Sequence, residues 1–339
     1  MKSDTNLLDI NRPDTIRMSV DEATQLGAQA LRHLGYIDED VSIIVDQLID
    51  NALCGYHFAG LPRILAMAND PKCRRPRKPL KVVHETPLSA LIDGGSNVGY
   101  VTAYHATQMA IAKAKTNGIA SVGVHNSYFS GRNAYYAEMI ARAGLVGIHT
   151  ACGRLKVLPA GGMKPALGTN PFCVGFPSTQ GPVVFDMGTA SLMWGEVVLC
   201  AHTGALLPEG AAYDGQGLPS RDAQAVFNGG GVVPFGGHKG YGLSFAIQAL
   251  GLLAGSAFAN GQVQDYGFLF IVIDPGLMLP HADFPAQMSE LVAKIKATPR
   301  RPDVDEIRIP SERAFREREL RRGQGLVLER KVVDTLKSL

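Results

Sequence analysis

The stretch IASVGVHNSYFSGRNAYYAEMIARAGLVGIHTA, residues 119–151, decides the fold class. Its first part, 119–124, is rich in β-branched residues and predicts a buried strand. The polar segment 125–133 predicts a loop, 134–144 predicts a helix, and 145–151 predicts another strand. This order of strand, helix and strand is typical of an α/β sheet domain.

The segments before this stretch continue with helices and strands. GYVTAYHATQMAIAKAKTNG (99–118) predicts a helix that Gly118 ends, and VVHETPLSALIDGG (82–95) alternates enough to predict strands. Nearer the N-terminus, SVDE (19–22) is a capping box, which predicts a helix to about His33 with Gly35 as its stop.

A second N-terminal helix is expected to begin near Asp40 and to end at or near Gly55. Its apolar residues recur at the spacing of one helical face: Val41, Ile44, Val45, Leu48, Ile49 and Ala52. His57 therefore follows the end of a helix.

The second half of the chain alternates glycine-rich turns with apolar elements. The segment 158–172 is rich in glycine and proline, and 183–190 predicts a strand that ends in a turn. A glycine loop then leads into a long apolar helix over 229–255. A further strand is expected over 268–275 and a charged helix over 309–325.

Composition narrows the function classes. The length of 339 residues predicts two or three packed units. The net charge of +2 predicts no broad attraction to nucleic acid or to a membrane, and no apolar stretch is long enough to span one. Five cysteines without C-x-x-C spacing favour a reducing cytoplasm over disulfides or a metal site. The start of the sequence lacks a secretory signal pattern.

The segment FGGHKGYGLS (235–244) carries the clearest chemistry. Gly236 and Gly237 free the backbone, Lys239 supplies a positive charge, and a helix starts with its amides facing the loop. Backbone donors, a helix N-terminus and one cation are how proteins bind phosphates. The alternative interpretation is a helix start that is glycine-rich only for packing.

Two further turns are candidates for a ligand site. LGTNPF (167–172) contains a tight turn around Asn170, with a purely structural turn as the alternative. VFDMGT (184–189) ends a predicted strand with Asp186, at the sheet edge where α/β folds bind ligands. Asp186 could accept from a ribose hydroxyl or hold a catalytic group, or it could only cap the next turn.

Together these segments resemble the malate/L-lactate dehydrogenase-type oxidoreductases. The similar stretches are KTNGIASVGVHNS, ARAGLVGI, LPAGGMKPALGTNPF, VVFDMGTA, PFGGHKGYGL and IPSERAFRERE, in order over roughly 90–320, with GYHFAGLPRIL (55–65) before them. That family includes sulfolactate, ureidoglycolate and diketogulonate dehydrogenases. It also includes reductases of Δ1-piperideine-2-carboxylate and Δ1-pyrroline-2-carboxylate.

The resemblance implies an enzyme that uses NAD or NADP, usually a homodimer, with a small carboxylate as substrate. It implies an α/β fold with a non-Rossmann, mixed-sheet cofactor domain. The expected organisation is a helical N-terminal part (1–80), the cofactor domain (81–265) and a C-terminal segment (266–339) that returns to the N-terminal part.

The resemblance also assigns roles to single residues. Cofactor contacts are implied for Gly153, Asp186, Met187, Gly188, Lys239, Gly240, Ser311, Glu312 and Arg313, with Ser311 replacing the family's glycine. Arg63 matches the arginine near the substrate carboxylate.

Both histidines of the family's site are replaced. The family's proton donor, in a Ser-His-Gly segment, aligns with Ala59, and its second histidine aligns with Phe129. His57 and His125 stand nearby. His57 is either a relocated catalytic acid or a histidine at a helix exit bonded to a carbonyl, and His125 directly follows a buried strand.

The replacements bear on the reaction. A ketone needs a proton on oxygen as hydride arrives, usually from a side chain, whereas a cyclic iminium already carries its charge. The leading hypothesis is an NAD(P)H-dependent reductase of a small 2-oxo or cyclic 2-imino carboxylate. In it, Arg63 pairs with the carboxylate, Asp186 orders the cofactor or the proton path, and His57 is the candidate acid. The alternatives are a cofactor-binding pseudoenzyme and a dehydrogenase whose substrate carries its own acid.

Overall fold

The computed structural model describes residues 14–259, 262–263 and 266–339. The chain forms two compact units. The terminal unit comprises residues 1–76 and 292–339, and the sheet unit comprises residues 77–291.

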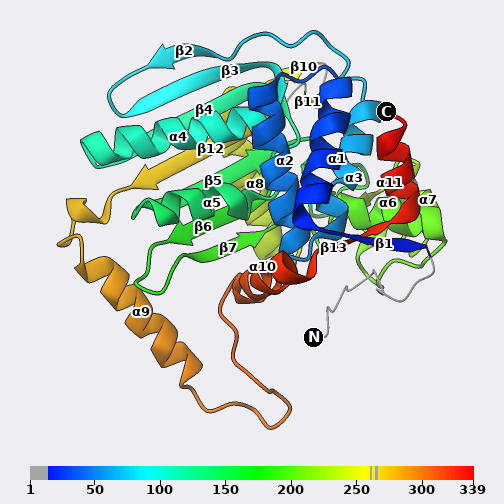
Figure 1. Cartoon of the computed structure of the whole chain (residues 1–339). Coiled ribbons are helices and arrows are strands. Elements are labelled where there is room, and N and C mark those ends of the chain that lie inside the picture. Colours follow the sequence, from blue (N-terminus) through cyan, green and yellow to red (C-terminus); the bar gives the residue numbers. More distant parts are fainter. Residues whose placement is uncertain (1–13, 260–261, 264–265) are drawn as a thin grey trace. The chain divides into compact units, whose positions relative to one another are not determined.

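The sheet unit is built on a mixed sheet of seven strands, in the order β2-β3-β4-β12-β5-β6-β7 (Figure 1). Only β3 and β4 pair in parallel, and every other neighbouring pair is antiparallel. The strands are Lys81–Glu85 (β2), Ser89–Val98 (β3), Ile119–Tyr128 (β4), Val146–Cys152 (β5), Phe172–Phe176 (β6), Val183–Met187 (β7) and Tyr266–Ile273 (β12). This sheet confirms the expected α/β fold with a mixed sheet.

Strand β12 lies between β4 and β5 and is hydrogen-bonded to both. The sheet unit therefore continues past residue 265, as far as Leu291. The helix α9 (Asp283–Lys296) follows the 3-10 turn Pro275–Leu277, and the limit between the two units falls within it.

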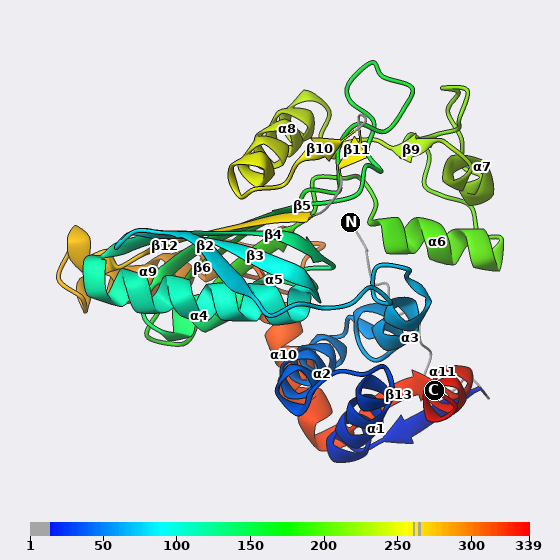
Figure 2. The same ribbon diagram turned by 90° about the horizontal axis from the view of Figure 1, so that it is seen from above.

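Helices cover both faces of the sheet (Figure 2). One face carries α4 (Gly99–Asn117) and α5 (Asn133–Arg142), whose apolar residues share one core cluster with β3, β4, β5 and β12. The other face carries α8 (His238–Leu253), where a Cβ added at Gly251 would overlap Cys152 Sγ of β5. Glycine is needed there because helix and strand approach too closely for a side chain.

Four strands end at one edge of the sheet. Because β12 runs antiparallel to both β4 and β5, and β6 runs antiparallel to both β5 and β7, the strands β3, β4, β5 and β7 share one direction. Their last residues are Val98, Tyr128, Cys152 and Met187. We call this side the carboxyl edge, and it is where α/β sheets usually bind ligands.

A smaller subdomain of the sheet unit has a core of its own. It contains α6 (Trp194–Thr203), α7 (Ala223–Phe227) and the two-stranded ribbon of β8 (Ala212–Tyr213) with β9 (Gly231–Val232). A second ribbon pairs β10 (Phe258–Ala259) with β11 (Gln262–Val263).

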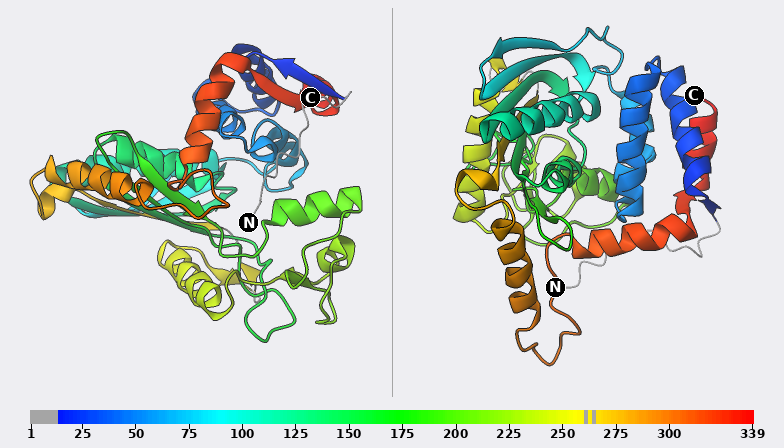
Figure 3. Two further views of the ribbon diagram at one scale, coloured as in Figure 1. Left: turned by 90° about the horizontal axis from the view of Figure 1, so that it is seen from below. Right: turned by 60° about the vertical axis from the view of Figure 1, so that its left-hand side comes forward.

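The terminal unit is mostly helical. It contains α1 (Val20–His33), α2 (Asp38–Leu53), the 3-10 turn η1 (His57–Ala59), α3 (Pro62–Asn69), α10 (Glu312–Gln324) and α11 (Arg330–Lys337). The strands β1 (Thr15–Met18) and β13 (Leu326–Glu329) join its two chain segments as an antiparallel pair. The blue helices α1 and α2 lie side by side, with α11 against α1 (Figure 3).

Local signals in the sequence predicted several of the helices and strands correctly. Ser19 and Glu22 form the capping box at the start of α1, and the six residues of the apolar stripe on α2 are all buried. Helix α2 begins at Asp38, two residues earlier than expected, and its first turn is acidic, which the helix dipole favours.

The predicted loop over 125–133 was wrong in its first part. Strand β4 continues to Tyr128, because the ladder with β3 resumes after a bulge and pairs Asn97 with Ser127. The polar side chains at this end concealed the strand.

Candidate active site

Two of the predicted motifs contact each other in the sheet unit. The side-chain amide of Asn170 donates to the backbone oxygen of Ser244 (2.9 Å) and to Gln248 Oε1 (3.1 Å). The Gly168 amide also donates to Gln248 Oε1, at 3.3 Å. The tight turn is therefore fastened to the inner face of α8.

The turn after β7 belongs to the same assembly. The Thr189 amide donates to the Thr169 oxygen (2.9 Å), and the Phe235 amide donates to the Thr189 oxygen (2.9 Å). Gly153 lies beside Gly168, where a Cβ added to Gly168 would come within 3.1 Å of the Gly153 nitrogen. Four segments that are distant in sequence thus meet at the carboxyl edge.

The N-terminus of α8 has the features of an anion site. Gly237 is the N-cap residue, and Gly236 and Gly237 have φ values of 57° and 62°, which other residues rarely adopt. A Cβ at either position would meet nothing within 4 Å, so the space beside them is open. Lys239 is exposed, whereas Gly240 is buried against Phe235. The segment therefore combines an open helix end with a closely packed first turn.

Asp186 lies at the end of β7 and contacts the start of α5. Its Oδ2 accepts from the Ala134 amide at 2.8 Å. Burial raises the pKa of Asp186, while the amides of Ala134 and Asn133 and the charge of Arg132 oppose that rise. Asp186 thus holds Ala134, in the first turn of a helix and 52 residues before it, instead of capping the turn that follows it.

Met187 and Gly188 continue from Asp186 into the turn. Both are half-buried. A Cβ at Gly188 would come within 2.8 Å of Met193 Sδ, so the backbone of this turn lies close to the start of α6.

The remaining predicted site residues belong to the terminal unit. His57 lies in η1, and its Nε2 is 2.9 Å from Arg321 Nη1. Burial and the Arg321 charge lower the pKa of His57 to about 4, with Glu317 opposing. The imidazole is therefore neutral at pH 7, and its Nε2 accepts from the guanidinium. This environment favours the helix-exit interpretation, with a guanidinium in place of the carbonyl, because that nitrogen has no proton to give.

Ala59 and Arg63 lie just beyond His57. The Ala59 oxygen accepts from the Asn51 side chain at 3.1 Å, and Arg63 is half-buried in the first turn of α3. Ala59 cannot replace the imidazole that the family has at its position.

The 311–313 segment starts α10. Ser311 has φ 62°, the left-handed conformation for which glycine is better suited. The Glu312 carboxylate accepts from the Ile309 amide (2.9 Å) and Arg316 (2.7 Å), and it also pairs with Lys296. Burial raises the pKa of Glu312, but the hydrogen bonds from these partners outweigh it, so the pKa lies below its ordinary value. Arg313 lies over the Tyr56 ring, 5.4 Å from its centre.

Sequence reasoning missed a strained region at the carboxyl edge. Ser96, Asn126 and Phe129 all have positive φ, between 52° and 63°. Asn126 donates to Asp93 Oδ1 at 2.7 Å and accepts from Ser96 Oγ at 3.0 Å. Strain of this kind concentrates at functional sites. The D-G-G-S turn at 93–96 was the available sequence signal.

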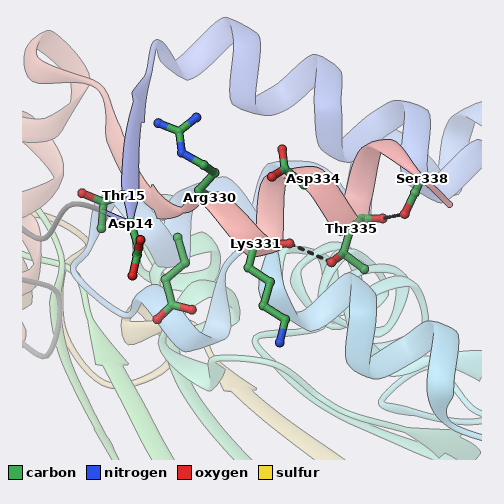
Figure 4. A pocket seen from close by; sticks show the side chains of 8 residues that line it. Asp14, Thr15, Arg330, Lys331, Asp334, Thr335 and Ser338 are labelled. Atoms are coloured by element: carbon green, nitrogen blue, oxygen red, sulfur yellow. Dashed lines mark hydrogen bonds between the residues drawn. The ribbon is translucent and has the colours of Figure 1, made fainter.

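A hollow of about 760 Å³ lies in the terminal unit (Figure 4). It is lined by Asp14, Thr15, Glu329, Arg330, Lys331, Asp334, Thr335 and Ser338. None of the predicted site residues lines it, and its mixture of charges indicates no particular ligand.

Two histidines with lowered pKa, His149 and His57, make stability depend on pH. His149 is fully buried, stacks on Phe270 at 4.0 Å and has its pKa lowered to about 4 by burial, as His57 does. Between about pH 6.5 and pH 4 the unfolded chain holds protons on these rings that the folded chain does not. The free energy of unfolding should therefore fall as pH is lowered through this range, by at most about 1.4 kcal/mol per unit for each ring.

Urea unfolding at pH 7 and pH 5 measures this dependence. His57→Gln should reduce the change in the free energy of unfolding between pH 7 and pH 5. His84→Gln, at an exposed position of β2, should leave that change as it is in wild type. Equal slopes for wild type and the His57 variant would contradict the burial of a neutral ring.

Comparison with known proteins assigns the chain to a class and then to a family. The family model described as malate/L-lactate dehydrogenase matches residues 18–337. A malate dehydrogenase of Pyrococcus abyssi is 33% identical, over 96% of this chain and 94% of its own length. A Δ1-pyrroline-2-carboxylate/Δ1-piperideine-2-carboxylate reductase of Pseudomonas putida is 34% identical, over 69% of this chain and 70% of its own length.

A solved malate dehydrogenase structure from Pyrococcus horikoshii is 30% identical, with a TM-score of 0.84 and coverage of 96% of this chain and 95% of that one. The protein is therefore an enzyme of the dehydrogenase and reductase class. It belongs to the malate/L-lactate dehydrogenase family. These comparisons confirm the resemblance and the fold expected from the sequence.

The described residues also limit other chemistry. Within them, no helix is both long and apolar enough to cross a membrane. No cluster of three or more histidine, cysteine, aspartate or glutamate side chains in that part of the chain could bind a metal ion. None of the five cysteines, all within the described residues, forms a disulfide.

Proposed function

We propose that this enzyme transfers hydride between NADH or NADPH and C2 of a small 2-oxo or cyclic 2-imino carboxylate, with oxidation of the 2-hydroxy acid as the reverse reaction. The observation that carries the proposal is the convergence of four segments at the carboxyl edge, beside the open, glycine-capped N-terminus of α8. The names of the relatives, which act on malate or on cyclic imino acids, support the substrate class.

The residues at this edge fit a dinucleotide. The open space beside Gly236 and Gly237, the free amides of a 16-residue helix and the exposed Lys239 suit a phosphate group. Gly153 and Gly188 let the backbone pack closely at this edge, against Tyr266 and Met193 respectively, and Met187 lies in the same turn as Gly188. A bound reduced nicotinamide supplies hydride, and these residues hold and orient it.

The remaining residues divide the other tasks. Arg63 is proposed to pair with the substrate carboxylate, because a guanidinium matches the two oxygens of that group. Asp186 is proposed as a positioning residue, since its carboxylate holds the start of α5. His57 is retained only as the weaker candidate acid, because its Nε2 faces Arg321. Ser311, Glu312 and Arg313 are proposed to contact the cofactor from α10.

Turnover with two substrates tests the proposal. Oxidation of NADH and of NADPH is measured with Δ1-pyrroline-2-carboxylate and with pyruvate side by side. Turnover of either substrate supports the proposed reaction. If only the imine reacts, the missing histidines reflect a substrate that needs no protein acid.

The missing histidines also favour a second candidate. Ala59 and Phe129 leave both family positions without an imidazole, which suits a protein that binds the dinucleotide without catalysis. Calorimetry, which measures cofactor binding, combined with turnover assays separates the two candidates. Cofactor binding without turnover on a broad panel of oxo and imino acids would favour this alternative, and robust turnover would exclude it.

Lys239→Ala should weaken cofactor binding by about tenfold, the loss of roughly 1.4 kcal/mol, because it removes the cation beside the helix N-terminus. Titration calorimetry with NADPH measures the change. Lys115→Ala, at an exposed position near the end of α4, is the matched control and should bind as wild type does. Equal affinity of the Lys239 variant and wild type would remove this lysine from the site.

We further propose that the enzyme is a cytoplasmic homodimer. The five cysteines without C-x-x-C spacing favour a reducing compartment. The outer face of α8 exposes Phe245 (63%) and Leu253 (72%), an apolar surface that a second copy could cover. Light scattering of the purified chain measures its mass, and a monomer at micromolar concentration would contradict the dimer.

A further inference from the structure

One aromatic hydroxyl lies at the carboxyl edge, and no role has been assigned to it. Tyr266 is the first residue of β12, the strand between β4 and β5. Its backbone pairs with Ser127 near the end of β4, and the next residue, Gly267, pairs with Cys152 at the end of β5. Tyr266 therefore lies where two of the parallel strands end.

The ring of Tyr266 covers the backbone that precedes the site loop. A Cβ added at Gly153 would overlap this ring, so the glycine allows the phenol to lie directly on the chain. The ring also meets Phe129 edge-on, with centres 6.3 Å apart and planes at 67°. Tyr266 thus lies between Gly153 and the strained residue Phe129.

Other titratable groups near this edge lie in different surroundings. The carboxylate of Asp186 accepts from the start of α5. His125 pairs in register with Asp93, whose pKa its charge helps to lower, and its ring lies against Gly255. The Tyr128 ring is buried beside Phe129. Tyr266 is half-buried, and its ring also packs near Phe268, with ring centres 6.1 Å apart.

We propose that Tyr266 is the catalytic acid for reduction of a 2-oxo acid at this edge. The inference rests on the proposed function. As hydride from the reduced nicotinamide forms the new C–H bond at C2, the carbonyl π pair moves to oxygen and takes the proton of the Tyr266 hydroxyl. The phenolate then regains a proton from water. Phenols can donate in this way because the O–H group is a good hydrogen-bond donor to an oxyanion.

Tyr266→Phe tests the assignment because it keeps the ring and removes only the hydroxyl. The kcat for pyruvate should fall by about 100-fold or more, the range typical for loss of a general acid. The KM for NADPH, the melting temperature and the kcat for Δ1-pyrroline-2-carboxylate should stay near wild type. Tyr104→Phe, which removes an exposed hydroxyl bonded to Gln108, is the matched control and should change none of these values.

A second variant separates catalysis from structure. In Tyr266→Phe combined with Phe129→His, an imidazole lies beside the position of the lost hydroxyl, and histidine tolerates the positive φ of residue 129 better than phenylalanine. Partial recovery of pyruvate reduction would support a proton-transfer role.

Three outcomes would overturn the inference. The first is unchanged pyruvate reduction by Tyr266→Phe, and the second is equal loss with both substrates, which indicates a structural role. The third is a wild-type enzyme that reduces only the imine, because an acid at this edge would then have no use. Lack of turnover of both substrates by wild type would instead contradict the proposed function itself, and the inference with it.

Discussion

Gly240→Ala is expected to destabilise the sheet unit by about 1–3 kcal/mol or more and to abolish cofactor binding. A Cβ at this position would overlap the backbone oxygen of Phe235, which cannot rotate away as a side chain could. The Phe235 amide also holds the Thr189 oxygen, at 2.9 Å. A shift of Phe235 would therefore displace the turn after β7 as well as the start of α8.

Gly242→Ala is the matched control, two residues further along the same helix. Position 242 is exposed, and a Cβ there would meet nothing within 4 Å. Alanine should stabilise the helix by about 0.5–1 kcal/mol, since glycine loses more backbone entropy. Urea unfolding and NADPH calorimetry measure both variants. Similar behaviour of the two variants would show that the packing at Gly240 is not what holds the loop.

Asp50→Ala is expected to destabilise the terminal unit by about 3–5 kcal/mol. Asp50 of α2 and Arg318 of α10 form an ion pair at 2.8 Å, and their side chains are only 13% and 8% exposed. Removal of the carboxylate takes a counter-charge from a guanidinium that is only 8% exposed. The pair joins the two chain segments of the unit, so α10 should loosen first.

The control is an exposed pair on the same helix. Glu319 and Arg322 lie 3.0 Å apart with side chains 68% and 58% exposed, so Glu319→Ala should cost less than about 1 kcal/mol. The double variant Asp50→Leu with Arg318→Met should recover most of the loss, because it leaves no charge buried. Chemical unfolding measures all three. A small effect of Asp50→Ala would indicate that water reaches Arg318.

The positions of several helices and strands followed from local patterns. The capping box at Ser19, the apolar stripe on α2 and the stop at Gly118 each act within a few residues, and the structure contains all three. The end of β4 was harder to predict, because its polar residues pair with β3 across a bulge that no local pattern reveals.

For the candidate site, the motifs predicted which segments matter, and the fold shows how those of the sheet unit meet. The LGTNPF turn and the start of α8 were selected separately from the sequence. Their contact through Asn170 joins residues 74 positions apart. The periodicity of the sequence does not reveal contacts between residues so far apart. Which residue meets Asn170 depends on how α8 packs on the sheet.

By itself, the sequence determined an α/β fold, because helix caps, apolar spacing and glycine turns are local patterns. Its motifs also identified the family by resemblance and the segments proposed to form the site. Only the tertiary structure decided the environment of each group. It placed Arg321 on His57 across 264 residues and the start of α5 on Asp186. It also laid Tyr266 between Gly153 and Phe129. Protonation and reactivity depend on such neighbours, and packing brings them together from distant parts of the chain.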